Sequence, residues 1–180
     1  MTPRERAAAA LNLRIPDQVP TFELEFQLEE EMFGRPFLRQ HQLENLTPSE
    51  QERLVKENAE YMLEVYSSLE WSIIPIHYLP EKWIGVTARH IRALTGDTYM
   101  LTTHGDGTFA IPNGQEFTEF VYSIADHPEE VEAESAAMAQ AAIERNKRLI
   151  DTGIDCFILC SDYCFNSGPF LSPQMFRRFV

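Results

Sequence analysis

The chain contains little cysteine: three residues in 180, all between positions 156 and 164. The polar start and the short alanine run at 7–10 lack the long apolar stretch of a secretion signal. An odd number of cysteines without such a signal predicts free thiols in a reducing cytoplasm. On a predicted strand, Cys156 and Cys160 would lie about 13 Å apart, at roughly 3.3 Å per residue. This distance is too long for one shared zinc ion, because zinc–sulfur bonds are about 2.3 Å.

Positive charge is also scarce. Lysine and arginine together number 15 against 28 aspartate and glutamate residues, which gives a net charge of -13. Such a surface disfavours the phosphate backbone of nucleic acids and anionic membranes as partners. No apolar run is long enough to span a bilayer. We therefore expect neither a nucleic-acid partner nor a membrane association.

Several catalytic and cofactor motifs are missing. The chain has no Gly-x-Ser-x-Gly and no His-Glu-x-x-His sequence, and residues 104–107 (His-Gly-Asp-Gly) lack the spacing of a phosphate-binding loop. A nucleotide cofactor is therefore not indicated. Internal repeats, low-complexity segments and Gly/Ser linkers are absent as well. With 44% hydrophobic residues, the whole chain 1–180 is predicted to be one domain with a sizeable core.

The sequence instead alternates between predicted helices and predicted strands. Capping-box sequences that begin with Thr2 and Thr47 mark two helix starts, and Gly96 and Gly153 mark two helix ends. The predicted helices cover residues 1–12, 29–36, 47–68, 82–94, 126–152 and 173–180, and the predicted strands cover 19–26, 71–76, 98–103 and 155–161. Such alternation predicts a parallel sheet with right-handed crossovers.

Four strand–helix units are half of a (β/α)8 barrel, which typically needs about 250 residues. The final predicted helix at 173–180 has a clear start but no end. We therefore predict an α/β fold in which the chain is about the N-terminal half of a TIM barrel, and a fragment of a longer protein.

Polar side chains gather where the predicted strands end. They are Glu23 and Glu25, His77 and Tyr78, His104 and Asp106, and Asp162 and Tyr163, with Asn166 in the following loop. In a parallel sheet these ends meet at the edge where such folds bind ligands. Alternatively, Glu23 and Glu25 occupy a solvated strand face and His77 is a satisfied core histidine. The succession of four polar strand ends favours a binding site.

Three segments together resemble a known family. They are MTPRERAAAALNLRIPDQVP at 1–20, DHPEEV at 126–131, and residues 153–179, with the sequences GID, SD and GPFLSPQMFRRF. They are similar to the uroporphyrinogen-decarboxylase-like superfamily, which includes cobalamin-dependent methyltransferases, and the similarity spans the whole chain. The resemblance implies a TIM barrel, in agreement with the alternation of helices and strands.

The resemblance implies methyl transfer rather than heme-pathway decarboxylation. The decarboxylases carry an arginine-rich motif after their first strand for the substrate's carboxylates, whereas this chain has Glu23-Leu24-Glu25-Phe26-Gln27 there. These acids would repel a polycarboxylate. His77 also stands where the decarboxylases have an acid. The methyltransferase branch is similar to this chain in its non-basic first strand end and in an aspartate at the position of Asp162.

In that branch a zinc ion activates a thiol or an ether oxygen, and the methyl group passes to or from a corrinoid protein. A Lewis acid lowers the pKa of a bound thiol. The family's zinc ligands lie in the second barrel half, so the resemblance assigns none here. The resemblance and the placement at the strand ends together predict a catalytic role for Asp162, His77 and Tyr163, and substrate contacts for Glu23, Glu25, Tyr78, His104 and Asn166.

Two alternatives remain open at this stage. One is a decarboxylase that acts on a tetrapyrrole or a smaller acid. The other is a non-catalytic half-barrel that pairs with its own copy or with another chain, because open sheet edges and apolar helix surface favour association. A homo-oligomer would then be expected.

Overall fold

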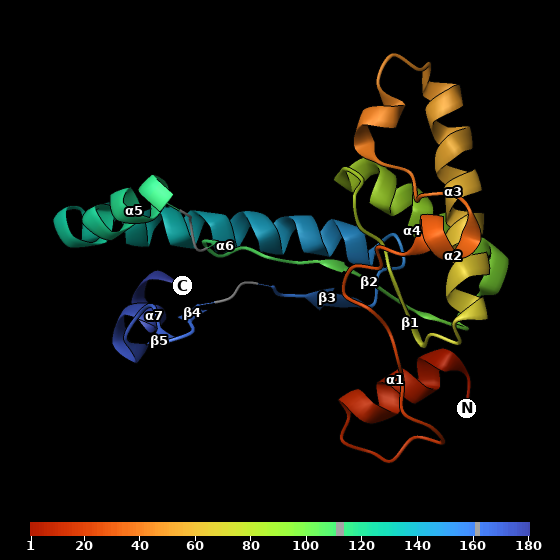
Figure 1. Cartoon of the computed structure of the whole chain (residues 1–180), viewed down its shortest axis with the longest axis horizontal. Helices are drawn as coiled ribbons and strands as arrows, with labels where there is room; N and C mark the ends of the chain where they lie inside the picture. The colour runs from red at the N-terminus through yellow and green to blue at the C-terminus, as the bar shows by residue number, and fades with distance from the viewer. Residues whose placement is uncertain (111–113, 161–162) are drawn as a thin grey trace. The chain divides into compact units, whose positions relative to one another are not determined.

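The computed structural model describes residues 1–110, 114–160 and 163–180, which form a mixed α/β structure (Figure 1). The elements in chain order are α1 (Pro3–Leu11), α2 (Glu29–Phe33), a 3-10 turn (Gln40–Leu43), α3 (Pro48–Ser68), β1 (Ile73–Pro75), α4 (Glu81–Thr95), β2 (Met100–His104), α5 (Gly114–Asp126), α6 (Pro128–Ile150), β3 (Cys156–Ile158), β4 (Cys164–Phe165), β5 (Gly168–Pro169) and α7 (Pro173–Phe179). Contacts divide the chain into two compact units: residues 1–103 with 147–157, and residues 104–146 with 158–180.

The central feature is a three-stranded parallel sheet in the order β1-β2-β3. Ile73 pairs with Met100, and α4 connects β1 to β2. Helices α5 and α6 connect β2 to β3. The predicted alternation of parallel strands and helices is confirmed for these three strands and is compatible with half of a barrel. The complete barrel and the single-domain organisation stay predictions.

The predicted strand at 19–26 is wrong. The segment is irregular and bends at Leu24 and Glu25. Thr21 accepts a hydrogen bond at 2.9 Å from the N–H of Ser72, the residue directly before β1. Of the apolar side chains that suggested alternation, Phe26 is buried, whereas Phe22 and Leu24 are exposed. A bend in the chain removes the regular two-residue alternation on which the prediction depended.

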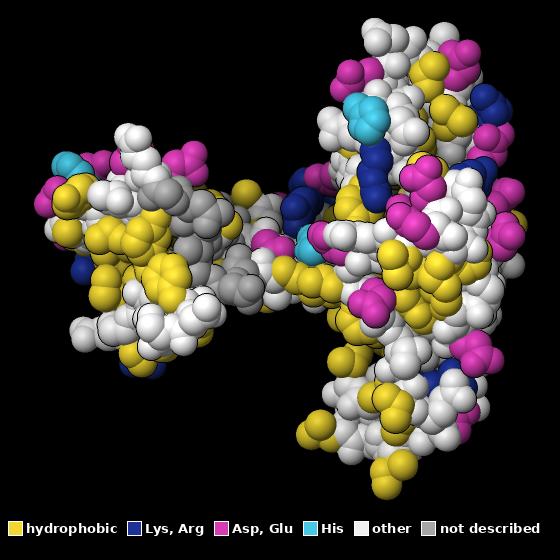
Figure 2. Space-filling model, viewed as in Figure 1, with side chains coloured by type: hydrophobic (Ala, Val, Ile, Leu, Met, Phe, Trp, Pro, Cys, Tyr) yellow, Lys and Arg dark blue, Asp and Glu magenta, His cyan; other side chains and the backbone are white. Residues whose placement is uncertain are grey.

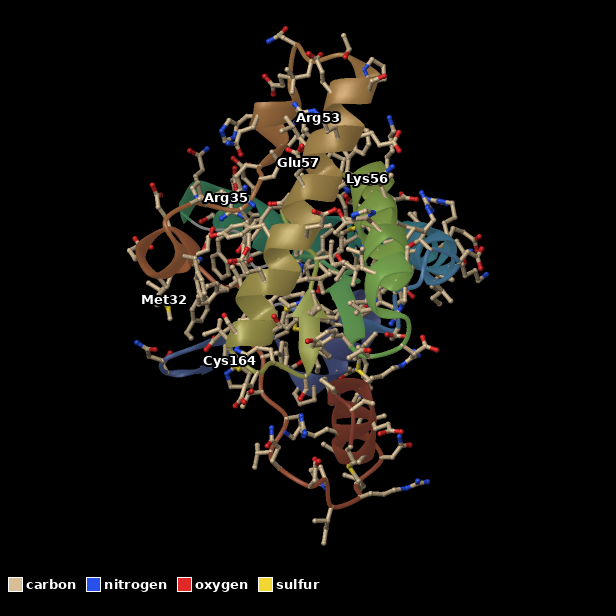
Figure 3. The ribbon with its side chains drawn as sticks, turned by 90° about the vertical axis from the view of Figure 1, so that its right-hand side faces the viewer. Met32, Arg35, Arg53, Lys56, Glu57 and Cys164 are labelled. Carbon is tan, nitrogen blue, oxygen red and sulfur yellow. The ribbon has the colours of Figure 1, made fainter. Side chains whose placement is uncertain are left out.

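The first unit holds the larger core. Helix α3 packs against α4 and β1, and Figure 3 shows α3 and α4 running side by side next to β1 and β2. Val65, Ile74 and Ile91 from these three elements are completely buried in one apolar cluster. Residues Ile73–Pro75 of the strand predicted at 71–76 therefore form β1, inside the core of this unit.

Helix starts follow the predicted capping chemistry. Thr2 and Thr47 each accept a hydrogen bond from the backbone N–H three residues on, and Glu5 and Glu50 complete the two capping boxes. Ser172 caps α7 in the same way and accepts from the Met175 N–H at 3.2 Å. Each cap satisfies a backbone donor that the first helical turn leaves free.

An ionic network anchors the start of β3. Asp155 accepts hydrogen bonds from Arg4 at 2.6 Å, from the Leu101 N–H at 2.9 Å, and from Arg92. Arg92 also donates to the Gly153 carbonyl oxygen. Gly153 has φ +105°, and a Cβ there would lie 2.9 Å from the Arg92 side chain. The glycine therefore permits both the turn after α6 and the close approach of Arg92.

The second unit contains two elements that the sequence did not predict: α5 and the short antiparallel hairpin of β4 and β5. Its small core joins Ile124 and Val131 to Leu171 and Phe179. The Pro173–Phe179 helix was predicted and is confirmed. Within the part of the chain that the structure describes, no helix has both the length and the apolarity needed to cross a membrane.

Candidate functional site

A strained turn follows β1 and presents the best candidate site. Hydrogen bonds continue one residue beyond the strand, from the Ile76 N–H to the Thr102 carbonyl at 2.8 Å and from the Thr103 hydroxyl to the Ile76 carbonyl at 2.7 Å. His77 follows and is buried. Tyr78 then adopts φ +68°, a left-handed conformation that costs a non-glycine residue about 1–2 kcal/mol. Strain of this kind concentrates at functional sites, where surrounding packing holds it.

An ion pair between the buried Glu29 and the partly buried Arg39 lies beside this turn. Glu29, the first residue of α2, is 3% exposed. Its Oε1 accepts hydrogen bonds from Arg39 Nη2 at 3.1 Å and from the Phe37 N–H at 3.3 Å. The carboxylate thus closes the loop between α2 and the 3-10 turn. Removal of a charge pair from water is costly, so both charges depend on these bonds.

Tyr61 on α3 holds the same loop. Its hydroxyl donates to the Arg35 carbonyl at 2.6 Å, and the Arg35 guanidinium carbon lies 3.9 Å from the centre of the Tyr61 ring. Figure 3 shows Arg35 beside α3. The loop that carries Arg39 is therefore attached to the helix that packs on β1.

Arg39 joins the ion pair to the strained turn. Its guanidinium carbon lies 3.6 Å from the centre of the Tyr78 ring, a cation–π contact. Among the described residues, three buried atoms here have no hydrogen-bond partner: Glu29 Oε2, Arg39 Nη1 and the Tyr78 hydroxyl oxygen. Buried polar atoms are normally paired, so an unpaired acceptor, a cationic donor and a phenol in one place indicate a binding or catalytic function.

Aromatic side chains surround the group and change its proton affinities. Tyr66 stacks on Trp71 with ring centres 4.7 Å apart, and Phe26 contacts both rings edge-on. Burial raises the pKa of Tyr66 far above its ordinary value, with smaller contributions from Tyr78 and Glu29. Burial also raises the pKa of Tyr78, and the nearby carboxylates act in the same direction. Both phenols therefore keep their protons at neutral pH and can donate hydrogen bonds.

The charges of this group sum to a negative value. Glu25 and Glu29 both raise the pKa of Tyr78, whereas Arg39 lowers it. One arginine faces two carboxylates, and that arginine is already bonded to Glu29. The end of β1 therefore suits a neutral or cationic group better than a polyanion.

A second polar group lies in the other unit. His104 Nδ1 is 3.6 Å from Asp106 Oδ2, and Asp106 Oδ1 accepts a hydrogen bond from the Cys160 N–H at 2.5 Å. The Gly105 N–H donates to the Ile158 carbonyl at 2.9 Å. The residues after β2 and after β3 thus lie together, as expected for neighbouring parallel strands. The Tyr163 hydroxyl donates to the Phe109 carbonyl at 2.8 Å and is hydrogen-bonded to the Thr108 hydroxyl at 2.9 Å.

The predicted site residues thus fall into separate places. His77 and Tyr78 are adjacent in the first unit, with ring centres 6.0 Å apart, whereas His104 and Tyr163 belong to the second unit. Further predicted residues are Glu23 and Glu25, both exposed on the irregular segment, and Asn166, exposed between β4 and β5. Asp162 lies outside the described residues. Their functional roles stay predictions.

Sequence reasoning missed Glu29, Arg39 and the contribution of Tyr66 to the site. Glu29 belongs to the acidic run 29–31, in which nothing in the sequence indicates which carboxylate is buried. Arg39 lies in a loop far from β1 in sequence. Tyr66 lies on the buried face of α3, and its place beside Tyr78 depends on tertiary packing.

Among the described residues, no group of three or more histidine, cysteine, aspartate or glutamate side chains is arranged to hold a metal ion. No zinc ligand is therefore assigned here. The structure places the chain in the class of mixed α/β proteins with a parallel sheet. Comparison of the chain with known protein families, curated proteins and solved structures gave no match.

Proposed function

We propose that the chain is the N-terminal half of a (β/α)8 barrel enzyme that transfers a methyl group to or from a corrinoid protein or a thiol. The observation that carries the site is the buried group at the carboxyl end of β1, where Glu29, Arg39 and Tyr78 each have an unpartnered polar atom. Parallel α/β folds bind their ligands at this edge. The reaction type rests on the resemblance to the methyltransferase branch of the uroporphyrinogen-decarboxylase-like superfamily.

The charges at the end of β1 support methyl transfer over decarboxylation. A tetrapyrrole substrate carries several carboxylates, and two like charges 4 Å apart repel by about 4 kcal/mol near a protein surface. Arg39 is bonded to Glu29, so it is not free to neutralise such a substrate. A neutral or cationic methyl donor or acceptor avoids this repulsion.

In the proposed reaction, the corrinoid protein supplies or accepts the methyl group. The residues of this chain hold the small-molecule partner. Tyr78, protonated at neutral pH, donates a hydrogen bond to the heteroatom that loses or gains the methyl group. His77, directly before it, exchanges a proton with that heteroatom. Glu29 and Arg39 keep the Tyr78 ring in place through the cation–π contact.

The proposal is tested with methylcobalamin and a small thiol, by following the absorbance change on loss of the cobalt-bound methyl group. We expect His77→Ala to lower the rate by about 10²- to 10⁴-fold, the range of a lost acid–base group. Tyr78→Phe, which removes one hydrogen bond to a reacting atom, should lower it by about 10- to 100-fold. Asp162→Asn tests a second of the three catalytic residues predicted from the sequence, Asp162, His77 and Tyr163.

Tyr122→Phe is the control, because Tyr122 is 62% exposed on α5. Circular dichroism of each variant establishes that it is folded. Unchanged rates of methyl transfer in both His77→Ala and Asp162→Asn would contradict the proposed site. If chromatography shows that a tetrapyrrole acid loses carboxyl groups while no methyl transfer occurs, the chain is a decarboxylase and the proposed reaction is wrong.

A further inference from the structure

The second unit contains a pocket whose lining includes none of the residues at the end of β1 on which the proposed methyl transfer rests. Its volume is about 320 Å³, at the small end of the range of about 300–1,000 Å³ that ligand pockets occupy. The lining includes Tyr163, Cys164, Leu171, Pro173, Phe176 and Arg177. Hydrophobic side chains gather on the visible face of the part that carries α5, α7, β4 and β5 (Figure 2). Cys164 begins the short hairpin (Figure 3).

The pocket wall is built from fixed apolar groups. Tyr163 is held by the two hydrogen bonds of its hydroxyl, to Thr108 and to Phe109, so its ring is available to the pocket. Phe176 packs edge-on against this ring with centres 5.1 Å apart. Leu171 is 6% exposed and belongs to the core of the unit. A hydrocarbon or aromatic body would therefore meet an apolar surface that is already in place.

Arg177 contributes the one cationic side chain among the lining residues. Within residues 1–110, 114–160 and 163–180, its guanidinium has neither an ion-pair nor a hydrogen-bond partner. The neighbouring Arg178 differs, because it donates to Glu132 at 2.9 Å and lies 3.9 Å from Glu129. In a chain of net charge -13, an uncommitted arginine beside an apolar pocket selects a ligand with an anionic head group.

We propose that this pocket binds a small amphiphilic monocarboxylate, with its apolar body against Tyr163, Leu171 and Phe176 and its carboxylate on Arg177. The ligand class follows from charge complementarity and from the size of the pocket. This site is independent of the end of β1, so its failure would leave the proposed methyl transfer untouched.

Octanoate, 1-octanol and octylammonium are the probes, because they share a chain length and differ in head-group charge. Binding to the full chain is measured by chemical-shift titration in NMR. We expect octanoate to bind most tightly and octylammonium most weakly. Arg177→Gln should weaken octanoate binding by about 5- to 20-fold, because the lost contribution lies between that of an exposed ion pair and that of a charged hydrogen bond. The affinity for 1-octanol should stay unchanged.

Arg178→Gln is the matched control, and it should leave the affinity for octanoate unchanged. Cys164→Phe fills the pocket from an exposed strand position and should abolish binding of both octanoate and 1-octanol. Equal affinities for the three probes, or an effect of Arg178→Gln as large as that of Arg177→Gln, would overturn the proposal.

A second copy of the chain is the competing occupant of this surface. The labelling rate of the Cys164 thiol, measured without ligand over a range of protein concentrations, separates the two cases. A rate that is independent of protein concentration and falls on addition of octanoate supports the ligand site. A rate that falls as the protein becomes more concentrated would show that a second copy covers the pocket, and the ligand proposal would be wrong.

Discussion

At the scale of single residues, Glu29 stands out because it is a buried acidic side chain. Its side chain is 3% exposed, and Arg39 and the Phe37 N–H donate hydrogen bonds to one of its carboxylate oxygens. The other oxygen has no partner among the described residues. The carboxylate therefore contributes to the stability of the loop and also remains able to accept a ligand's donor.

Glu29→Gln should destabilise the protein by about 1–3 kcal/mol, because Arg39 then loses its charged partner while it stays largely covered by Tyr78. The free energy of unfolding is measured by urea titration with tryptophan fluorescence. Glu30→Gln, an exposed neighbour on the same helix, should change it by less than about 0.5 kcal/mol. Equal effects of the two substitutions would contradict the structural importance of the pair.

At the scale of elements, ion pairs and hydrogen bonds of the neighbouring Asp155 hold β3 in the sheet as much as the packing of its apolar side chains does. All three of its residues are only partly buried, yet Asp155 immediately before it binds Arg4 from α1, Arg92 from α4 and the Leu101 N–H from β2. One carboxylate thus connects three elements that are distant in sequence to the strand that ends the sheet.

Asp155→Asn should destabilise the first unit by about 2–3 kcal/mol, since an amide accepts weaker hydrogen bonds and leaves the Arg4 and Arg92 guanidinium groups with only the exposed Asp97 carboxylate as counter-charge. Urea titration of the variant gives this value. Asp151→Asn, at an exposed position after α6, is the matched control. A cost below about 0.5 kcal/mol for Asp155→Asn would show that the network adds nothing beyond an exposed ion pair.

At the scale of the whole molecule, we expect the burial of Tyr66 to limit stability at alkaline pH. The pKa of Tyr66 is raised in the folded state, whereas an unfolded tyrosine titrates near pH 10. Above about pH 10 the unfolded chain loses a proton that the folded chain keeps. The free energy of unfolding should therefore fall by about 1.4 kcal/mol per pH unit for each such phenol, and be unaffected by it below that pH.

The measurement is urea titration between pH 8 and 12 with tryptophan fluorescence, which reports Trp71 stacked on Tyr66. Tyr66→Phe should reduce the alkaline decline relative to the unsubstituted chain, whereas Tyr122→Phe, on an exposed position, should leave it unchanged. An identical decline in all three proteins would mean that general charge repulsion, and not burial of Tyr66, limits stability at high pH.

The local signals in the sequence predicted most helices correctly. Threonine, proline and glutamate at 47, 48 and 50 define the start of α3 because each supplies a capping interaction within one turn. The apolar run before His77 predicted β1, and the parallel strand ends predicted that residues after β2 and β3 would meet, as Asp106 and Cys160 do. The strand at 19–26 failed because alternation over a few residues does not reveal a bend in the backbone.

The sequence by itself determined where the capped helices begin, that the strands would be parallel, and that the chain would carry a strong negative charge. Each of these depends on neighbouring residues or on composition. Only the tertiary structure decided that Glu29 is buried while Glu30 is exposed, and that Arg39 stacks on Tyr78. Such pairings join segments far apart in the chain, and their energies depend on burial and distance, which local sequence patterns do not encode.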